Sequence, residues 1–314
     1  MKRVVTSTVL AVSLLFPLAS VHAEGVIRVT YAGSMGLVMD KALGPTFASQ
    51  AHATYQGQGQ GAYGMARLLM SKKLVADVFV SITPGPIELL QKAGLVDEAV
   101  PVASTSMVIA YSPKSRFAAA LKASSMTTGA TTTAPWWKVL QSPGLRFGRS
   151  DPAVDPQGQN IIFTMLLAEK YYKQPGLEKM MLGDTENQQQ VFGEGGLLSR
   201  LESGEVDASS GYESATRSAH LPFVALPDEI NLSNPSFTKD WYDTVSFSII
   251  DAKGQKQTLT PQPLVFYAAV LKNAPDPENA KAFIAFMQSA KGQSLLEADG
   301  YGKPKGPAMP AIPQ

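Results

Sequence analysis

The sequence predicts an α/β fold with two domains, and three observations support this prediction. From residue 24 onward, short apolar runs alternate with segments of helical periodicity, which is the pattern of sheets covered by helices. The chain has 314 residues, a length at the upper end for one domain. Its hydrophobic content of 45% is enough to form a sizeable core.

Residues 1–23 have the features of a secretory signal peptide. Two basic residues precede an apolar run from about Val9 to Leu18, and a small-residue cleavage site ends at Ala23. An uncleaved anchor is disfavoured because the run is too short to span a bilayer and is interrupted by a serine and a proline. We therefore expect a mature chain that begins at Glu24 and is located in a bacterial periplasm.

The first half of the mature chain predicts a regular alternation of elements. In order, these are a strand over 26–31, a helix that buries Met35, Val38, Met39 and Leu43, a strand over 76–80, a helix over 87–93 and a strand over 106–111. A Gly-rich run over 56–61 precedes another helical pattern, but it lacks the Lys-Ser/Thr ending of a phosphate-binding loop. We expect a flexible turn there, with contact to a small polar ligand as the alternative.

The alternation resumes in the second half, after a turn-rich surface connection over 112–134. A helix is expected to begin at Pro135. The further predictions are strands over 145–148, 207–211, 223–226 and 264–270, a helix over 159–172, a helix from the Asn273-Ala274-Pro275-Asp276-Pro277 segment to Gln288, a last helix, and an extended or mobile Pro-rich tail over 303–314.

Composition argues against several classes of function. The signal peptide holds two of the 27 basic residues and none of the 26 acidic ones, so the mature chain has 25 against 26 and no long-range attraction for nucleic acid. The mature chain has two histidines, His52 and His220, and no cysteine, so most nucleophilic mechanisms and transition-metal sites lack their residues. An exported enzyme is therefore disfavoured.

Two serines occur where strands give way to helices. Ser34 follows Gly33 at the start of a helix, whose first N–H groups have no intrahelical partner and attract anions. Ser81 lies at the end of the next apolar strand along the sheet. Ligands in open α/β sheets bind at the carboxyl ends of strands, so both serines are expected at one crevice, although each alone is equally consistent with a helix cap.

Two acidic residues occupy similar junctions in the second half. Asp155 lies in the turn before the helix over 159–172, and Glu213 follows Tyr212 after the strand over 207–211. Each is also explained as a capping or first-turn acid that the helix dipole stabilises. The residues alone leave both interpretations open.

Taken together, these segments resemble periplasmic solute-binding proteins of ATP-binding cassette importers, in the branch that binds tungstate and molybdate. The resemblance covers nearly the whole mature chain, and its motifs occur in order: Tyr31-Ala32-Gly33-Ser34, Ala76-Asp77-Val78 leading to Ser81, Trp137-Lys138-Val139-Leu140 leading to Phe147-Gly148, Asp155-Pro156-Gln157-Gly158, Tyr212-Glu213-Ser214, and Leu226-Pro227-Asp228-Glu229-Ile230-Asn231-Leu232.

The resemblance implies a type II periplasmic-binding-protein fold, in which two α/β lobes joined by two crossover strands close on an oxyanion. It implies a first lobe of residues 24–104 plus 265–314 and a second lobe of residues 105–264. It also implies that the serines donate hydrogen bonds to the anion and that the two acids bond its molybdenum or tungsten centre, with the neighbouring glycine and tyrosine at the same site: Ser34, Ser81, Asp155, Glu213, Gly33 and Tyr212.

Two carboxylates beside a divalent anion repel it unless they bond its central atom. Molybdenum and tungsten can expand from four to six ligands whereas the sulfur of sulfate cannot, so Asp155 and Glu213 would select against sulfate. The sequence departs from the family at Gln157, Gln159 and Asn160, where Cys, Tyr and Arg are more usual, and this leaves the support of Asp155 open.

We therefore expect a monomeric receptor that captures tungstate or molybdate, needs no cofactor and delivers its ligand to a membrane permease. A receptor for sulfate, thiosulfate or another small anion is the first alternative. An exported hydrolase is the second.

Overall fold

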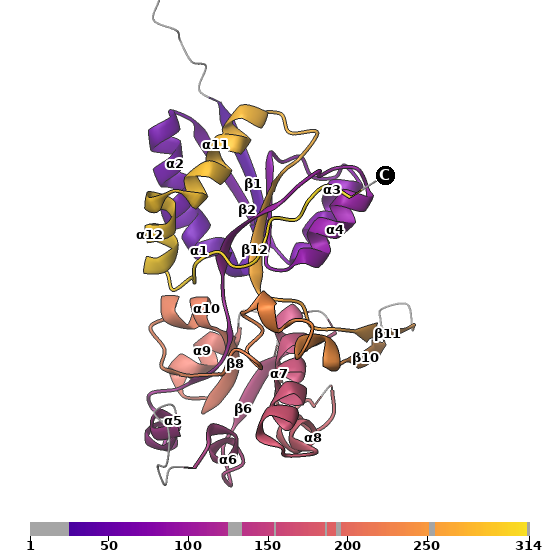
Figure 1. Cartoon of the computed structure of the whole chain (residues 1–314). Helices are drawn as coiled ribbons and strands as arrows, with labels where there is room; N and C mark the ends of the chain where they lie inside the picture. The colour runs from indigo at the N-terminus through magenta and orange to yellow at the C-terminus, as the bar shows by residue number, and fades with distance from the viewer. Residues whose placement is uncertain are drawn as a thin grey trace, which may run out of the picture.

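The computed structural model describes residues 25–124, 134–153, 155–185, 187–192, 196–250 and 255–312. They form two α/β lobes, each built on a five-stranded sheet, which lie one above the other in Figure 1. The predicted signal peptide lies outside the described residues. No helix in the described residues is long and apolar enough to cross a membrane.

The first lobe contains the sheet β2-β1-β3-β12-β4, in which β12 runs antiparallel to its two neighbours. Its strands are β1 (Val26–Ala32), β2 (Thr54–Gln60), β3 (Val78–Ser81), β4 (Val100–Ser104) and β12 (Val265–Val270). Its helices are α1 (Gly36–Val38), α2 (Gly44–Ala51), α3 (Ala62–Met70), α4 (Pro84–Lys92), α11 (Pro277–Gln288) and α12 (Ala290–Ala298).

The second lobe contains the sheet β7-β6-β8-β5-β9, in which β5 is the antiparallel strand between β8 and β9. Its strands are β5 (Met107–Tyr111), β6 (Phe147–Ser150), β7 (Val191–Phe192), β8 (Ala208–Tyr212) and β9 (Phe223–Ala225). Its helices are α5 (Ala118–Ser124), α6 (Trp136–Leu140), α7 (Pro156–Tyr172), α8 (Leu177–Leu182), α9 (Gly196–Ser203) and α10 (Glu213–Ser218).

The segments that connect the lobes are hydrogen-bonded to one another. The Thr105 N–H donates to the Leu264 carbonyl over 3.0 Å, and the Leu264 N–H donates to the Leu232 carbonyl over 2.7 Å. The Met107 N–H, at the start of β5, donates to the Asn231 carbonyl over 2.8 Å. The connecting segments therefore form one bundle of extended backbone.

The Gly-rich run is a strand and not the predicted turn. Residues 54–60 form β2, the exposed edge of the first sheet, and pair in parallel with β1. A Cβ atom on Gly57 would overlap the carboxylate of Asp40, and one on Gly59 would lie 2.5 Å from the ring of Tyr31. The glycines make room for a cluster in which the Tyr31 hydroxyl donates to Asp40 over 2.7 Å.

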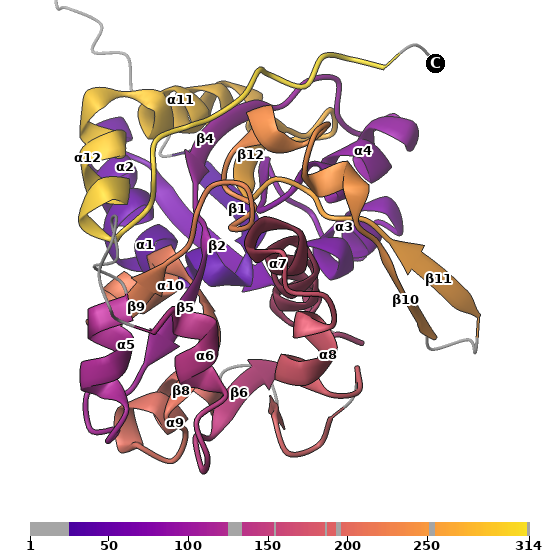
Figure 2. The same ribbon diagram turned by 60° about the horizontal axis from the view of Figure 1, so that its bottom comes forward.

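Three further segments differ from or extend the predictions. The connection over 112–134 contains helix α5, and its residues 125–133 lie outside the described residues. A hairpin of β10 (Phe247–Ile250) and β11 (Lys256–Leu259), which we did not predict, projects from the body (Figures 1 and 2). The tail is extended as expected and runs along the first lobe, where Met309 bridges Ala99 (Figure 2).

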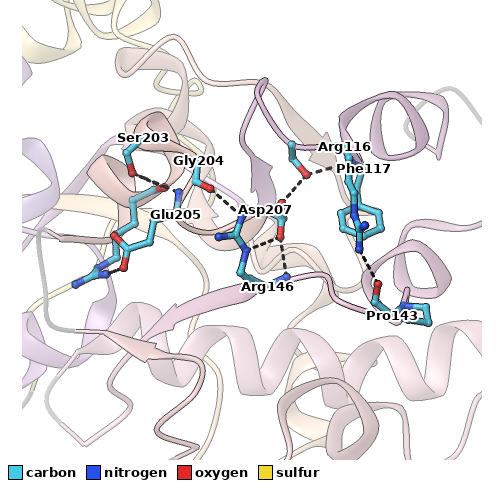
Figure 3. A network of polar contacts seen from close by, with 10 residues as sticks. Arg116, Phe117, Pro143, Arg146, Ser203, Gly204, Glu205 and Asp207 are labelled. Atoms are coloured by element: carbon cyan, nitrogen blue, oxygen red, sulfur yellow. Dashed lines mark hydrogen bonds and ion pairs between the residues drawn. The ribbon is translucent and has the colours of Figure 1, made fainter.

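A buried aspartate immediately precedes a central strand in each lobe, at the edge of the sheet opposite the carboxyl ends. In the first lobe, Asp77 accepts backbone hydrogen bonds from Arg28 over 2.7 Å and from Asp276 over 2.6 Å. In the second lobe, Asp207 accepts hydrogen bonds from the Arg146 backbone and Nε, over 2.9 and 3.0 Å, and from Ser115 over 2.8 Å (Figure 3). Burial opposes ionisation of Asp207, but these bonds outweigh it and lower its pKa.

Candidate functional site

A cavity of about 430 Å³ lies between the lobes, where the carboxyl ends of β1, β3, β6 and β8 approach one another. The first lobe contributes Gly33, Ser34, Leu37 and Ile82 among others to its wall. The second contributes Ser150, Asp155, Gln157, Leu197 and Tyr212 among others. Four of the six predicted site residues therefore line one cavity: Gly33, Ser34, Asp155 and Tyr212.

Ser34 lies in the first turn of the helical run that follows β1. The residue at the cap position is Ala32, and no side chain caps this turn, so Ser34 does not serve as a capping residue. Its carbonyl accepts a hydrogen bond from the Tyr301 hydroxyl over 2.7 Å, whereas its own hydroxyl has no hydrogen bond within the described residues. The hydroxyl and the N–H groups of this turn are thus available to a ligand.

Ser81 ends β3 as predicted but does not line the cavity. Its side chain is fully buried, and its hydroxyl donates to the Thr83 carbonyl over 2.8 Å. The cavity wall is formed by the next residue, Ile82. The structure therefore assigns the Ser81 hydroxyl to the turn before α4.

Asp155 is the N-cap of α7. One carboxylate oxygen, Oδ1, accepts from the Gln157 N–H over 2.9 Å, and Pro156 occupies the first helical position, where no N–H is needed. The other oxygen, Oδ2, has no hydrogen bond in the described part of the chain. Asp155 therefore serves as a cap and keeps one oxygen for the cavity.

The glycine of the Asp-Pro-x-Gly turn is required by close packing. A Cβ atom on Gly158 would overlap the Ser150 carbonyl and would lie 2.7 Å from the backbone of Asp151 and Pro152. The end of β6 is thus folded directly against the first turn of α7. This packing brings Ser150 and Asp155 onto the same wall.

The residues that depart from the family pattern support this turn. The Gln159 side-chain amide donates to the Pro152 carbonyl over 2.9 Å. The Asn160 amide donates to the Tyr212 hydroxyl over 3.0 Å, and the Gln157 amide donates to the Ser210 carbonyl over 3.3 Å. Together they fasten the start of α7 to the loop after β6 and to β8.

Glu213 follows Tyr212 but faces a different cavity. Its Oε1 pairs with Arg217 at 2.7 Å, and its Oε2 accepts from the Ser106 hydroxyl over 2.7 Å. It lines a separate cavity of about 510 Å³ beside the connecting segments, together with Asp228 and Lys305. The structure does not bring Glu213 together with Ser34 and Asp155.

Asp155 is the one charged side chain among the described residues that line the first cavity. Much of the remaining wall is apolar. It includes Leu37, whose side chain is 53% exposed to solvent. His52 and His220 end helical segments with φ of 49° and 54°, and neither lines this cavity. The site can hold a small anion through neutral donors and can offer one carboxylate oxygen to an electron-poor atom.

Sequence reasoning missed several residues of the wall, among them Ser150 and Tyr301. Ser150 ends β6, two residues beyond the strand predicted over 145–148, so a longer strand prediction would have pointed to it. Tyr301 comes from the segment after α12, and its ring packs on Phe266 with centroids 5.4 Å apart. No local pattern indicated that this tyrosine reaches Ser34.

The family model of bacterial extracellular solute-binding proteins matches residues 27–302. A solute-binding protein from Petrotoga mobilis is 30% identical over 243 residues, which cover 76% of this chain and 72% of that protein. A protein from Pyrococcus abyssi described as molybdate/tungstate-binding is 27% identical over 263 residues, which cover 77% of this chain and 73% of that protein.

Solved structures show the same fold at low sequence identity. A periplasmic molybdate-binding protein from Azotobacter vinelandii superposes with a TM-score of 0.57 and 17% identity over 89% of this chain and 100% of that one. A sulfate-binding protein from Mycobacterium tuberculosis superposes with a TM-score of 0.55 and 16% identity, over 88% of this chain and 86% of that one. The predicted type II periplasmic-binding-protein fold is thereby confirmed, and the chain belongs to the bacterial extracellular solute-binding protein family.

Proposed function

We propose that this chain is a periplasmic receptor that captures molybdate or tungstate and delivers it to an ATP-binding cassette importer. The observation that carries the proposal is the cavity wall, where the Ser34 hydroxyl and the Asp155 Oδ2, neither of which has a hydrogen bond within the described residues, come from opposite lobes. Relatives described as molybdate/tungstate-binding support the choice of ligand.

The wall suits an anion whose central atom accepts another ligand. With no cationic side chain among its described lining residues, a carboxylate beside a divalent anion is repulsive in a low-dielectric cleft. A bond between the Asp155 oxygen and molybdenum or tungsten turns this repulsion into attraction. We therefore assign Asp155 the role of metal-centre ligand, whereas Glu213 reaches the anion only if it leaves Arg217 and Ser106.

We further propose that residues 24–104 and 265–314 act as one closing unit and residues 105–264 as the other. The sheets support this division, because β12 returns to the first sheet directly after the second connection. Ser34 and Asp155 then lie on different units, so closure brings both onto one ligand and neither unit alone binds tightly.

A receptor for sulfate or thiosulfate is the second candidate. It is favoured by two observations: Glu213 lies off the wall, and Asp155 already serves as a helix cap. In that case the anion is held by hydroxyl and N–H groups alone.

In either case we propose a monomeric receptor without catalytic activity. Neither histidine lies on the cavity wall, so Ser34 has no imidazole base beside it.

Calorimetric titration of the purified protein with molybdate, tungstate and sulfate separates the two candidates. We expect saturable heat with molybdate and tungstate and none with sulfate. Equal binding of sulfate would overturn the coordination argument and favour the second candidate. Absence of heat with all three anions would overturn both.

A further inference from the structure

In the part of the chain that the structure describes, the buried side-chain polar atoms without partners all belong to the second lobe. Among the described residues, six buried side-chain atoms have no hydrogen bond, and all six lie between Trp137 and Ser210. Four of them are the hydroxyls of Ser150, Thr164, Ser209 and Ser210. Of these four residues, Ser150 alone lines the cavity between the lobes.

The direction of β6 places the Ser150 side chain on the face that borders the cavity. Successive residues of a strand point to opposite faces, so Ser150 shares a face with Gly148 and not with Arg149. A Cβ atom on Gly148 would lie 2.6 Å from Leu197, and Leu197 lines the same cavity as Ser150. Arg149 instead donates to the Asp184 and Thr185 carbonyls on the opposite face.

The burial of this hydroxyl is unfavourable unless something bonds to it. Ser150 is 3% exposed, so solvent scarcely reaches its side chain, and a buried hydroxyl without a partner costs free energy. Ser81, at the matching strand end of the first lobe, avoids this cost by donating to Thr83. Ser150 has no such local acceptor within the described residues.

We propose that the Ser150 hydroxyl donates a hydrogen bond to an oxygen of the bound oxyanion. This inference rests on the proposed function, and it makes Ser150 the second-lobe counterpart of Ser34. Ser150 and Asp155 line the same cavity, because the Gly158 turn packs the end of β6 against the first turn of α7. One anion oxygen is thus held by Ser150 while the central atom faces Asp155.

The test compares Ser150→Ala with Ser209→Ala. Ser209 pairs with Gly148 in the sheet and is fully buried with an unpartnered hydroxyl, but it does not line the cavity. In titrations with molybdate and tungstate, we expect Ser150→Ala to raise Kd by roughly ten- to a hundredfold, because a hydrogen bond to a charged group is lost. Ser209→Ala should leave Kd unchanged.

Thermal unfolding without ligand gives an independent readout. Removing an unpartnered hydroxyl should leave the Tm of both variants equal to or above that of the wild type, so Ser150→Ala weakens binding without weakening the fold. Should Ser150→Ala fail to fold, Ser150→Cys keeps the volume, replaces the hydroxyl with a weak donor and should raise Kd in the same direction.

The outcomes are distinguishable. Tight binding by the wild type with an unchanged Kd in the Ser150 variants overturns this inference alone. Equal losses in the Ser150 and Ser209 variants also overturn it, because the effect would then belong to the sheet. Absence of binding by the wild type overturns the proposed function and this inference together.

Discussion

The two lobes resemble each other in the hydrogen bonding of polar side chains at one end of the sheet and differ at the other end. At the end away from the cavity, Asp77 accepts hydrogen bonds from two backbone N–H groups, and Asp207 accepts them from backbone and side-chain donors. At the cavity, the first-lobe hydroxyl of Ser81 is bonded to its own turn, whereas the second-lobe hydroxyl of Ser150 has no partner in the described chain.

This difference indicates that the lobes have unequal roles. The first lobe presents a helix start and the Ser34 hydroxyl, which suit many small anions. The second lobe presents the Asp155 oxygen and the Ser150 hydroxyl, which are oriented by the packed turn at Gly158. We infer that the second lobe determines which anion is accepted, and the following predictions test this division.

The largest expected effect is at Asp155. Asp155→Ala should raise the Kd for tungstate roughly a hundredfold or more, since it removes the proposed ligand of the metal centre. It should also lower the free energy of unfolding by about 1 kcal/mol through loss of the helix cap. Titration calorimetry and urea unfolding measure the two effects separately.

Asp155→Asn is the matched control, because Asn caps helices well but carries no charge. It should restore stability but not tungstate affinity. If tungstate binding survives in this variant, Asp155 is a structural cap and the sulfate receptor becomes the better reading. Glu213→Gln should change the Kd much less, and a loss equal to that of Asp155→Ala would show that Glu213 enters the site.

A smaller effect, on the free energy of unfolding, is expected when a glycine is replaced by alanine at the third position of a helix. Each lobe offers one such glycine, Gly158 in α7 and Gly64 in α3. Gly158→Ala should lower the free energy of unfolding by about 2 kcal/mol or more, because its Cβ would overlap the Ser150 backbone. Gly64→Ala, where no atom lies within 4 Å of the added Cβ, should raise it by up to about 1 kcal/mol. Equal responses in urea unfolding would show that the turn at Gly158 is not tightly packed.

The smallest effect is expected at the opposite end of the second lobe. The pKa of Asp207 is lowered in the folded state, so its contribution is present above the unfolded pKa of about 3.9 and is lost as pH falls through the folded value. Arg146→Ala should therefore cost about 1 kcal/mol at pH 7, since Arg146 is half exposed, and less at about pH 3. A cost that does not shrink in acid would contradict this account. Ligand affinity should not change.

Much of the fold was predictable because strands such as β3, β5, β6 and β8 are buried on both faces. The run over 264–270 and the helix face of Met35, Val38, Met39 and Leu43 are buried as the pattern indicated. The Gly-rich strand β2 was not predictable. Its glycines leave room for Asp40 and Tyr31, and these two side chains approach β2 only in the folded chain. The hairpin of β10 and β11 likewise belongs to neither five-stranded sheet, so the alternation of strands and helices along the chain did not predict it.

The site was predictable in position but not in detail. The sequence predicted Ser34, Ser81 and Asp155 at strand-to-helix junctions, and the structure confirms these positions. The sequence did not show that the Ser81 hydroxyl would donate to the Thr83 carbonyl or that Glu213 would pair with Arg217. These contacts depend on side-chain torsions and on neighbours distant in the chain. Ser150 was overlooked for the same reason, since the absence of a partner is a tertiary property.

The hydrogen bonds among the connecting segments bear on how the two lobes can move relative to each other. Because Thr105, Leu264 and Leu232 are linked through their backbones, the segments resist sliding past one another. We therefore expect the lobes to move relative to one another mainly by bending at these segments. If the proposed function holds, the filled and empty forms differ chiefly in the angle between the lobes, which a membrane permease can sense from the outer surface without touching the ligand.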